Sequence, residues 1–168
     1  MDYNTHKPRN PTIKVRTSGK HQRFTNSEIK SAAEFFLKLL FAGKRYKVDV
    51  LLSNRKNLKR DEGYCGYCER LDGTRNPRRF RIALDNNLNK REALETLAHE
   101  TVHVAQYVTN TMIDRRNGGV TFNERQYNID NDDPAMYYFS PWEIDAYGRS
   151  IGLVVLWKIH CNKKARKR

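Results

Sequence analysis

The chain has 168 residues, of which 38% are hydrophobic and 30% are charged, and its formal net charge is +13. This length and composition are typical of one soluble domain with a core of its own. No run of apolar residues approaches about 18 and the first residues lack an apolar signal core, so we expect neither a transmembrane helix nor secretion. Three cysteines are an odd count that does not indicate a disulfide framework, which favours a cytoplasmic location.

Positive charge is concentrated at the two ends of the sequence. Residues 1–60 carry 15 Lys or Arg against 4 Asp or Glu, residues 61–157 carry 11 against 15, and residues 158–168 carry 6 against none. Basic ends are typical of a chain that binds a polyanion, most simply nucleic acid, and a solubilising charge excess is the alternative. We predict a flexible basic arm over 1–24 with a short strand at 12–15, a folded domain over 25–160, and a disordered basic tail over 161–168.

Local signals then predict a helix followed by three strands. Thr25 and Glu28 have the spacing of a capping box at a helix start, and Gly43 is a natural C-cap. Patterns of apolar residues predict strands at 46–52, 64–71 and 79–85, separated by a polar, basic loop at 53–62 and a turn at 72–77.

The central signal is a second helix that carries two histidines one turn apart. Asn89 and Glu92 form another capping-box pattern, and residues 99–103 of the amphipathic stretch after them read His-Glu-Thr-Val-His. Positions i and i+4 share a helix face, so His99 and His103 can direct both imidazoles at one zinc ion. Glu100 can then take a proton from a water bound to that ion. Two surface histidines without a metal are the alternative.

The sequence after this helix is less regular. Residues 109–140 show no periodic pattern, and we expect this stretch to cover a cleft and to help select the substrate. A last helix begins with Ser140 as N-cap, Pro141 at the first position and Glu143 at the third, again the spacing of a capping box. A catalytic zinc normally has three protein ligands. Glu143 is a candidate for the third, with Asp145 as its stand-in or as a partner of the ligands, unless Glu143 only completes the capping box.

Residues 95–103, Glu-Thr-Leu-Ala-His-Glu-Thr-Val-His, resemble the active-site helix of zincin metallopeptidases, especially SprT-like and other small intracellular zincins. The strand at 79–85 resembles the zincin edge strand that pairs with an extended substrate. SprT-like proteins use a third histidine soon after the motif, which this chain lacks. Instead, residues 142–148 resemble the second helix of gluzincins, where a small residue follows the ligand glutamate three positions later. Glu143 is followed by Ala146 at that spacing, so the resemblance implies Glu143 as the third ligand.

Cys65 and Cys68 form a CxxC pair, which is half of a zinc ribbon. A second, structural zinc held by Cys65, Cys68, His160 and Cys161 is chemically allowed, although adjacent ligands such as His160 and Cys161 are geometrically awkward. Reduced, partly buried thiols are the alternative.

These observations predict an α+β, zincin-like fold. We expect a small antiparallel or mixed sheet of about three to four strands packed against the active-site helix, with one helix before it and one after. The predicted function is zinc-dependent hydrolysis of peptide bonds in a protein or peptide substrate, with Tyr147, or Tyr137 or Tyr138, donating a hydrogen bond to the oxyanion. The SprT-like resemblance implies substrates bound to DNA. Two alternatives stay open: a nucleic-acid-binding protein whose zinc is structural or vestigial, and a metal-dependent hydrolase of another bond.

Overall fold

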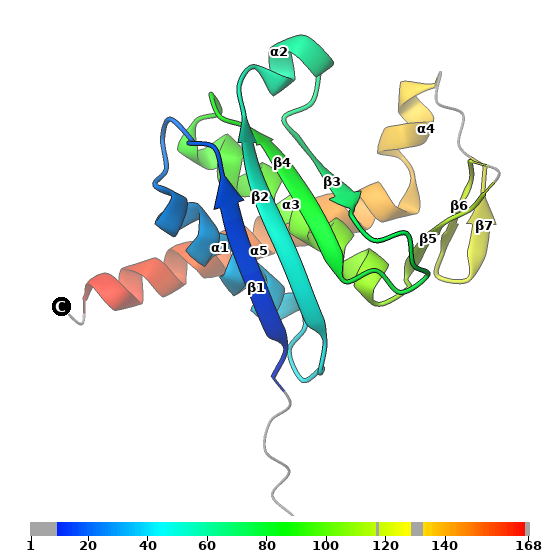
Figure 1. Ribbon diagram of the computed structural model, residues 1–168, viewed down its shortest axis with the longest axis horizontal. Coiled ribbons are helices and arrows are strands. Elements are labelled where there is room, and N and C mark those ends of the chain that lie inside the picture. The colour runs from blue at the N-terminus through cyan, green and yellow to red at the C-terminus, as the bar shows by residue number, and fades with distance from the viewer. Residues whose placement is uncertain (1–9, 117, 129–132, 167–168) are drawn as a thin grey trace, which may run out of the picture.

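The computed structural model describes residues 10–116, 118–128 and 133–166. In these residues the fold is α+β, with a mixed four-stranded sheet, a three-stranded antiparallel sheet and five helices, which confirms the predicted class (Figure 1). The elements in chain order are β1 (Thr12–Ser18), α1 (Asn26–Leu40), β2 (Lys47–Arg55), α2 (Leu58–Glu62), β3 (Gly66–Arg70), β4 (Arg79–Asp85), α3 (Lys90–Val108), β5 (Met112–Asp114), β6 (Val120–Phe122), β7 (Arg125–Tyr127), α4 (Pro134–Tyr138) and α5 (Pro141–Ala165).

The main sheet has the strand order β1-β2-β4-β3. β1, β2 and β4 run parallel, and β3 pairs antiparallel with β4, so β3 has a free edge. α1 and α3 pack on one face of the sheet, and α5 lies behind them against α3 (Figure 1). Because side chains alternate along a strand, every second residue of β2 from Val48 to Asn54 is buried under the helices, and the residues between them point to the other face.

The core lies between the sheet and these helices. Its side chains pack α1 and α3 against the sheet. The large, fully buried ones come from β2, β4 and both helices: Ile29, Phe36, Leu37, Val50, Leu52, Phe80, Ile82, Leu84 and Leu97. Both predicted capping boxes are present, at Thr25 with Glu28 and at Asn89 with Glu92, so α1 and α3 begin where the sequence indicates.

One boundary prediction is confirmed in part and two are wrong. The short strand predicted at 12–15 is present as β1, which extends to Ser18 and pairs with β2 from Thr12–Lys47 to Ser18–Ser53. The expected tail is helical as far as Ala165, because no Gly or Pro interrupts α5 near its end and its last cations favour a helix C-terminus. The loop at 53–62 is shorter than expected, since β2 continues to Arg55 and α2 follows. Residues 1–9 and 167–168 lie outside the described residues.

Two further predictions about the sheet and the long stretch need correction. The strand at 79–85 is β4, which lies inside the sheet between β2 and β3. In the described residues the edge strands are β1 and β3, and β3 is the one that packs against α3. Residues 109–140 contain β5, β6, β7 and α4, elements too short to show a period in sequence. Met112, Val120 and Phe122 pack with Trp142 in a second small core that ties this part to α5. None of the helices in the described ranges is both long and apolar enough to span a bilayer.

Candidate metal centre

α3 carries His99 and His103 through the middle of the molecule. Its capping box fixes the start of the helix, where Oδ1 of Asn89 accepts from the backbone N–H groups of Arg91 and Glu92, both at 3.0 Å. Nearly every residue from Ala93 to Val108 is buried, so the two imidazoles lie in the interior on one helix face. The surface-histidine alternative is therefore wrong.

Glu143 points from the first turn of α5 to the imidazoles of His99 and His103. The N-cap Ser140 makes no side-chain capping hydrogen bond, and its buried Oγ has no hydrogen-bond partner. The predicted capping box at Ser140 and Glu143 is thus absent. Instead, Glu143 Oε2 lies 3.1 Å from Nε2 of His99, and Oε1 lies 3.2 Å from Nε2 of His103.

His99, His103 and Glu143, called the ligand group below, have the geometry of a metal site. The two Nε2 atoms lie 3.0 Å apart, and all three side chains are buried. Tetrahedral ligands about 2.0–2.1 Å from an ion lie roughly 3.3 Å from each other, so the observed separations of 3.0–3.2 Å fit one ion at the centre. Within the described residues this is the one cluster of three or more His, Cys, Asp and Glu side chains that could hold a metal ion.

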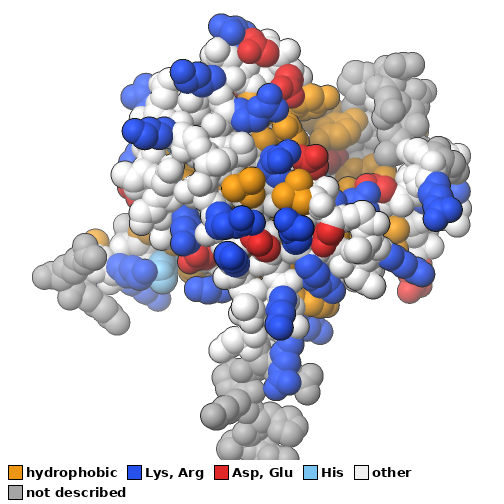
Figure 2. Space-filling view, viewed as in Figure 1, with side chains coloured by type: hydrophobic (Ala, Val, Ile, Leu, Met, Phe, Trp, Pro, Cys, Tyr) orange, Lys and Arg blue, Asp and Glu red, His pale blue; other side chains and the backbone are white. Residues whose placement is uncertain are grey.

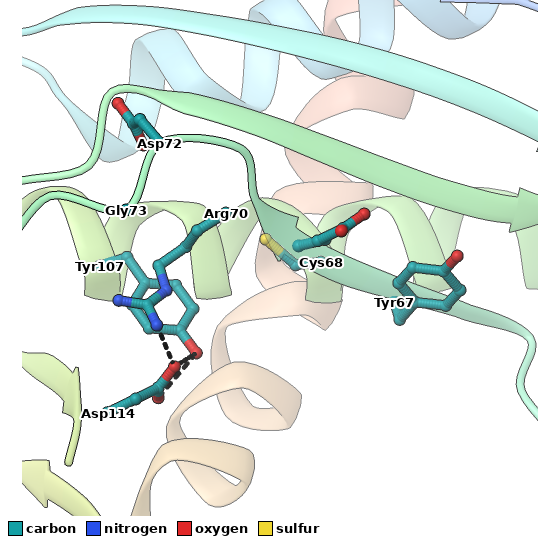
Figure 3. A pocket seen from close by; sticks show the side chains of 8 residues that line it. Tyr67, Cys68, Arg70, Asp72, Gly73, Tyr107 and Asp114 are labelled. Atoms are coloured by element: carbon teal, nitrogen blue, oxygen red, sulfur yellow. Dashed lines mark hydrogen bonds and ion pairs between the residues drawn. The ribbon is translucent and has the colours of Figure 1, made fainter. Parts of the chain in front are cut away.

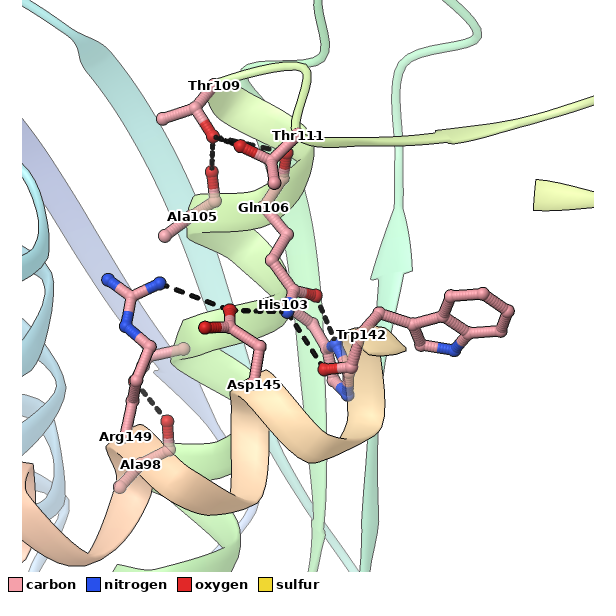
Figure 4. Close-up of polar contacts among 10 residues, drawn as sticks. Ala98, His103, Ala105, Gln106, Thr109, Thr111, Trp142, Asp145 and Arg149 are labelled. Atoms are coloured by element: carbon pink, nitrogen blue, oxygen red, sulfur yellow. Dashed lines mark hydrogen bonds and ion pairs between the residues drawn. The ribbon is translucent and has the colours of Figure 1, made fainter. Parts of the chain in front are cut away.

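Gln106 fixes the orientation of the His103 ring (Figure 4). Its Nε2 donates to the carbonyl oxygen of Trp142 and to Oδ2 of Asp145, both at 2.9 Å. A carbonyl can only accept, so this end of the amide is the NH2 group, and Oε1 faces Nδ1 of His103 at 2.8 Å. Nδ1 must therefore carry the hydrogen. In the neutral ring, Nε2 is then the lone-pair atom that points into the ligand group.

Asp145 supports this arrangement and is not a member of the ligand group. Its Oδ2 accepts from Gln106 and from Nη1 of Arg149, the latter at 3.3 Å (Figure 4). Of the two roles considered for Asp145, the structure places it as a partner behind the ligands. Sequence reasoning missed Gln106, although it lies three residues after His103, where a helix brings two side chains together.

Glu100 is buried beside the ligand group, on the side of β3. Burial raises the pKa of its carboxyl, the positive imidazoles of His103 and His99 oppose this effect, and the charge of Glu143 adds to it. The net pKa is raised, and the backbone of Cys68 acts in the opposite direction. Glu100 thus lies where α3 packs against β3.

The ligand group is also strongly coupled electrostatically. Burial opposes ionisation of Glu143, yet hydrogen bonds from His103 and His99 outweigh it and lower the pKa to about 2. Burial likewise opposes protonation of His103, and its contacts with Glu143 and Glu100 raise its pKa overall. In the metal-free chain the contacts of His103 with these carboxylates thus favour its protonated form.

Two of the three candidate tyrosines reach the ligand group. The Tyr147 ring centroid lies 4.4 Å from that of His99, and this ring is half exposed. Tyr137 is close enough to Glu143 to be influenced by its charge: burial, followed by that charge, raises the pKa of the Tyr137 hydroxyl. Tyr138 packs edge-on against Tyr137 at 5.3 Å and is mostly exposed.

The cysteines do not form a second metal site. Cys65 and Cys68 lie at β3, whereas the C-terminal half of α5 runs away from that strand (Figure 1). There, the His160 ring packs 4.8 Å from Phe35, and Cys161 is exposed. A zinc held by both pairs is therefore excluded by position. Burial, and then the charge of Glu100, raise the pKa of the Cys68 thiol.

A hollow of about 420 Å³ lies along β3 (Figure 3). Its lining does not include the ligand group or Glu100. On one side is β3 itself, and on the other are the end of α3 and β5. Arg70 pairs with Asp114 at 2.7 Å and lies over the ring of Tyr107 at 5.0 Å, while the Tyr107 hydroxyl donates to Asp114 at 3.1 Å. Sequence reasoning missed these residues because they come from three separate elements.

Comparison of the chain with protein-family models, with curated proteins and with solved structures finds no match. The ligand group, Glu100 and the free edge of β3 are therefore the features from which a function is inferred.

Proposed function

We propose that this chain is a zinc-dependent metallopeptidase of zincin type, in which His99, His103 and Glu143 hold the ion. The observation that carries the proposal is the position of Glu143, whose two oxygens lie 3.1 and 3.2 Å from the two histidine Nε2 atoms. The likeness of residues 95–103 to the zincin active-site helix supports the same conclusion.

The ligand set favours zinc and favours catalysis over a structural role. Imidazole nitrogens with a carboxylate oxygen are a usual donor set for zinc. Structural zinc sites are closed by four protein ligands, whereas catalytic sites have three and leave one position for water or substrate. In the residues that the structure describes, no fourth His, Cys, Asp or Glu joins the ligand group.

The mechanism follows from the residues around that position. Bound zinc supplies a water whose pKa is lowered to about 7 and polarises the scissile carbonyl. Glu100 takes a proton as the water oxygen bonds to the carbonyl carbon, and gives that proton to the nitrogen as the C–N bond breaks. The raised pKa of Glu100 suits a group that must both accept and return a proton. Tyr147, beside His99 and half exposed, donates a hydrogen bond to the oxygen that becomes negative.

The substrate is an extended segment of polypeptide that adds to the free edge of β3. That edge has unpaired backbone groups, since β3 pairs only with β4 in the described residues. The backbone of Cys68 on β3 influences the pKa of Glu100, so a strand added at this edge runs near the proposed base. The hollow beside Arg70 and Tyr107 then receives side chains of the substrate.

The test combines metal content with hydrolysis. Wild-type protein and Glu100→Gln should each contain about one zinc per chain, and Glu143→Ala should lose it. Wild-type protein should cleave casein or a quenched peptide library, a chelator should stop this, and Glu100→Gln should be slowed about 10²–10⁴-fold.

Three outcomes contradict the proposal or its mechanism. If Glu100→Gln retains wild-type hydrolysis, Glu100 is not the base. If the wild type cuts no peptide and His99→Ala abolishes folding, the zinc has a structural role. If a phosphodiester is cut and peptides are not, the chain is a hydrolase of another class.

A further inference from the structure

One face of the main sheet is left uncovered by the helices. α1 and α3 pack on the opposite face, and among the described elements only α2 comes near this one, at the end of β4 (Figure 1). The burial patterns of β1, β2 and β4 show which residues point outward, because buried and accessible positions alternate. We call the outward residues the open sheet face: Lys14, Arg16, Lys47, Asp49, Leu51, Ser53, Arg55, Tyr67, Glu69, Arg79 and Arg81.

The open sheet face is strongly basic. It carries six Lys or Arg against two carboxylates, and Figure 2 shows these cations spread across the surface over β1, β2 and β4. Strand pairing places Lys14, Asp49 and Arg79 in one row across three strands. The next row holds Arg16, Leu51 and Arg81, followed by Glu69 on β3.

Only part of this charge is neutralised within the molecule. Asp49 pairs with Arg16 at 3.0 Å, Glu69 pairs with Arg81 at 2.8 Å, and Arg55 pairs with Glu62 of α2 at 2.9 Å. Lys14, Lys47 and Arg79 form no side-chain ion pair with any described residue. The exposed cations Lys44, Arg45 and Arg75 lie in the loops at the end of the sheet where β2 and β4 begin, so the basic surface continues there.

The composition of the open sheet face argues against a protein partner. Interfaces between proteins are anchored by exposed aromatic and aliphatic side chains. Of the large hydrophobic side chains that are exposed in the described residues, none lies on β1, β2, β3 or β4, and most lie on α4 and α5. Leu51 and Tyr67 of this face are only partly accessible. A surface with many guanidinium groups and no fully exposed large apolar side chain gains its binding energy mainly from charge.

We propose that the open sheet face binds nucleic acid through its sugar-phosphate backbone. Rows of Lys and Arg on a broad surface complement a chain of phosphates, and guanidinium groups bind phosphate oxygens bidentately. The partly exposed Tyr67, whose hydroxyl is held by Arg55 at 2.9 Å, offers an aromatic ring at the side of this surface. This surface belongs to the folded domain and is distinct from the basic ends at which the sequence indicates nucleic-acid binding.

The open sheet face and the ligand group lie on opposite faces of the sheet. Glu100 and the histidines belong to α3, on the covered face, so nucleic acid on the open face leaves the ligand group accessible. Changes on one face can therefore be tested without disturbing the other.

The test uses fluorescence anisotropy of a labelled 20-nucleotide single strand with the full-length zinc-loaded protein. The double variant Lys14→Glu, Arg79→Glu should weaken binding about tenfold or more, and should lower the slope of log K against log salt by about 1.4, the value for two phosphate contacts on a single strand. The control Lys163→Glu, Lys164→Glu makes the same change of charge on α5 and should weaken binding by less than about threefold. Zinc content should be unchanged in both.

If the two double variants weaken binding equally, attraction is due to net charge alone and the proposal is wrong. It is also wrong if only the α5 variant weakens binding, or if the protein binds vesicles of phosphatidylserine and phosphatidylcholine but not the oligonucleotide. Lys14→Gln, Arg79→Gln is the second variant, for use if the charge reversal lowers the melting temperature. It should give a smaller loss in the same direction, and wild-type affinity for this variant would equally refute the proposal.

Discussion

Replacing Gln106 by Met should separate the role of this residue in the metal centre from its role in packing. Met has nearly the same length and no hydrogen-bonding amide, so the fully buried site stays filled. The substitution removes the acceptor of His103 Nδ1–H and both bonds to α5. Loss of a partner behind a metal ligand lowers affinity by about 10–100-fold, so the zinc dissociation constant should rise by that factor.

The variant should also be less stable without metal. A buried N–H left without an acceptor costs about 1–3 kcal/mol, and this loss should appear in the free energy of unfolding of the metal-free chain. Thr101→Val is the matched control, because Thr101 lies between the two histidines, is fully buried and bonds only to the Ala98 carbonyl of its own helix.

Competition with a chromophoric chelator measures zinc affinity, and urea denaturation measures stability. The control should bind zinc within about threefold of the wild type, since Thr101 does not touch a ligand. If Gln106→Met is destabilised and still binds zinc as tightly as the wild type, Gln106 is a packing residue and the inferred tautomer of His103 has no consequence for the metal.

Two further predictions concern pH and the tyrosines. The raised pKa of His103 stabilises the metal-free fold below the ordinary value of 6.5, and this contribution is lost as the pH rises through the folded-state pKa. The lowered pKa of Glu143 gives stability above 4.5 that is lost as the pH falls towards about 2. Zinc must displace the His103 proton, so the rise in melting temperature on adding zinc should grow between about pH 6 and about pH 8, and a constant rise would contradict the coupling. Tyr147→Phe should lower kcat about 10–10³-fold with zinc affinity unchanged. Tyr137→Phe should instead alter zinc affinity through Glu143. Peptide kinetics and zinc titration of both variants check this, and a loss of kcat in Tyr137→Phe alone would show that Tyr137 is the hydrogen-bond donor.

Local signals were sufficient for the parts of the fold that depend on a few neighbouring residues. The capping boxes at Thr25 and Asn89 satisfy their own helix ends, so the starts of α1 and α3 follow from sequence alone. The spacing of His99 and His103 likewise determines their common direction once α3 forms.

The other features of the fold and of the candidate site depend on contacts between segments that are distant in the sequence. At Glu143 the same spacing fits a capping box and a metal ligand, and only the packing of α5 against α3 distinguishes them. The alternation in residues 79–85 predicts a strand with one buried face and carries no information about its neighbours, so it cannot distinguish the interior position of β4 from an edge. The hairpin of β6 and β7 turns at Asn123 and Glu124 with φ of 46° and 67°, where Glu is an unusual residue for such a turn.

The free edge of β3 that would receive a substrate is also a place where copies of the chain can polymerise. Unpaired backbone groups attract any extended segment, including the same strand of another molecule. β3 is only five residues long and includes Glu69 and Arg70, and strand brevity and charge are the usual protections against such stacking. Neutralising both side chains should therefore make the protein prone to aggregation even where its fold is intact.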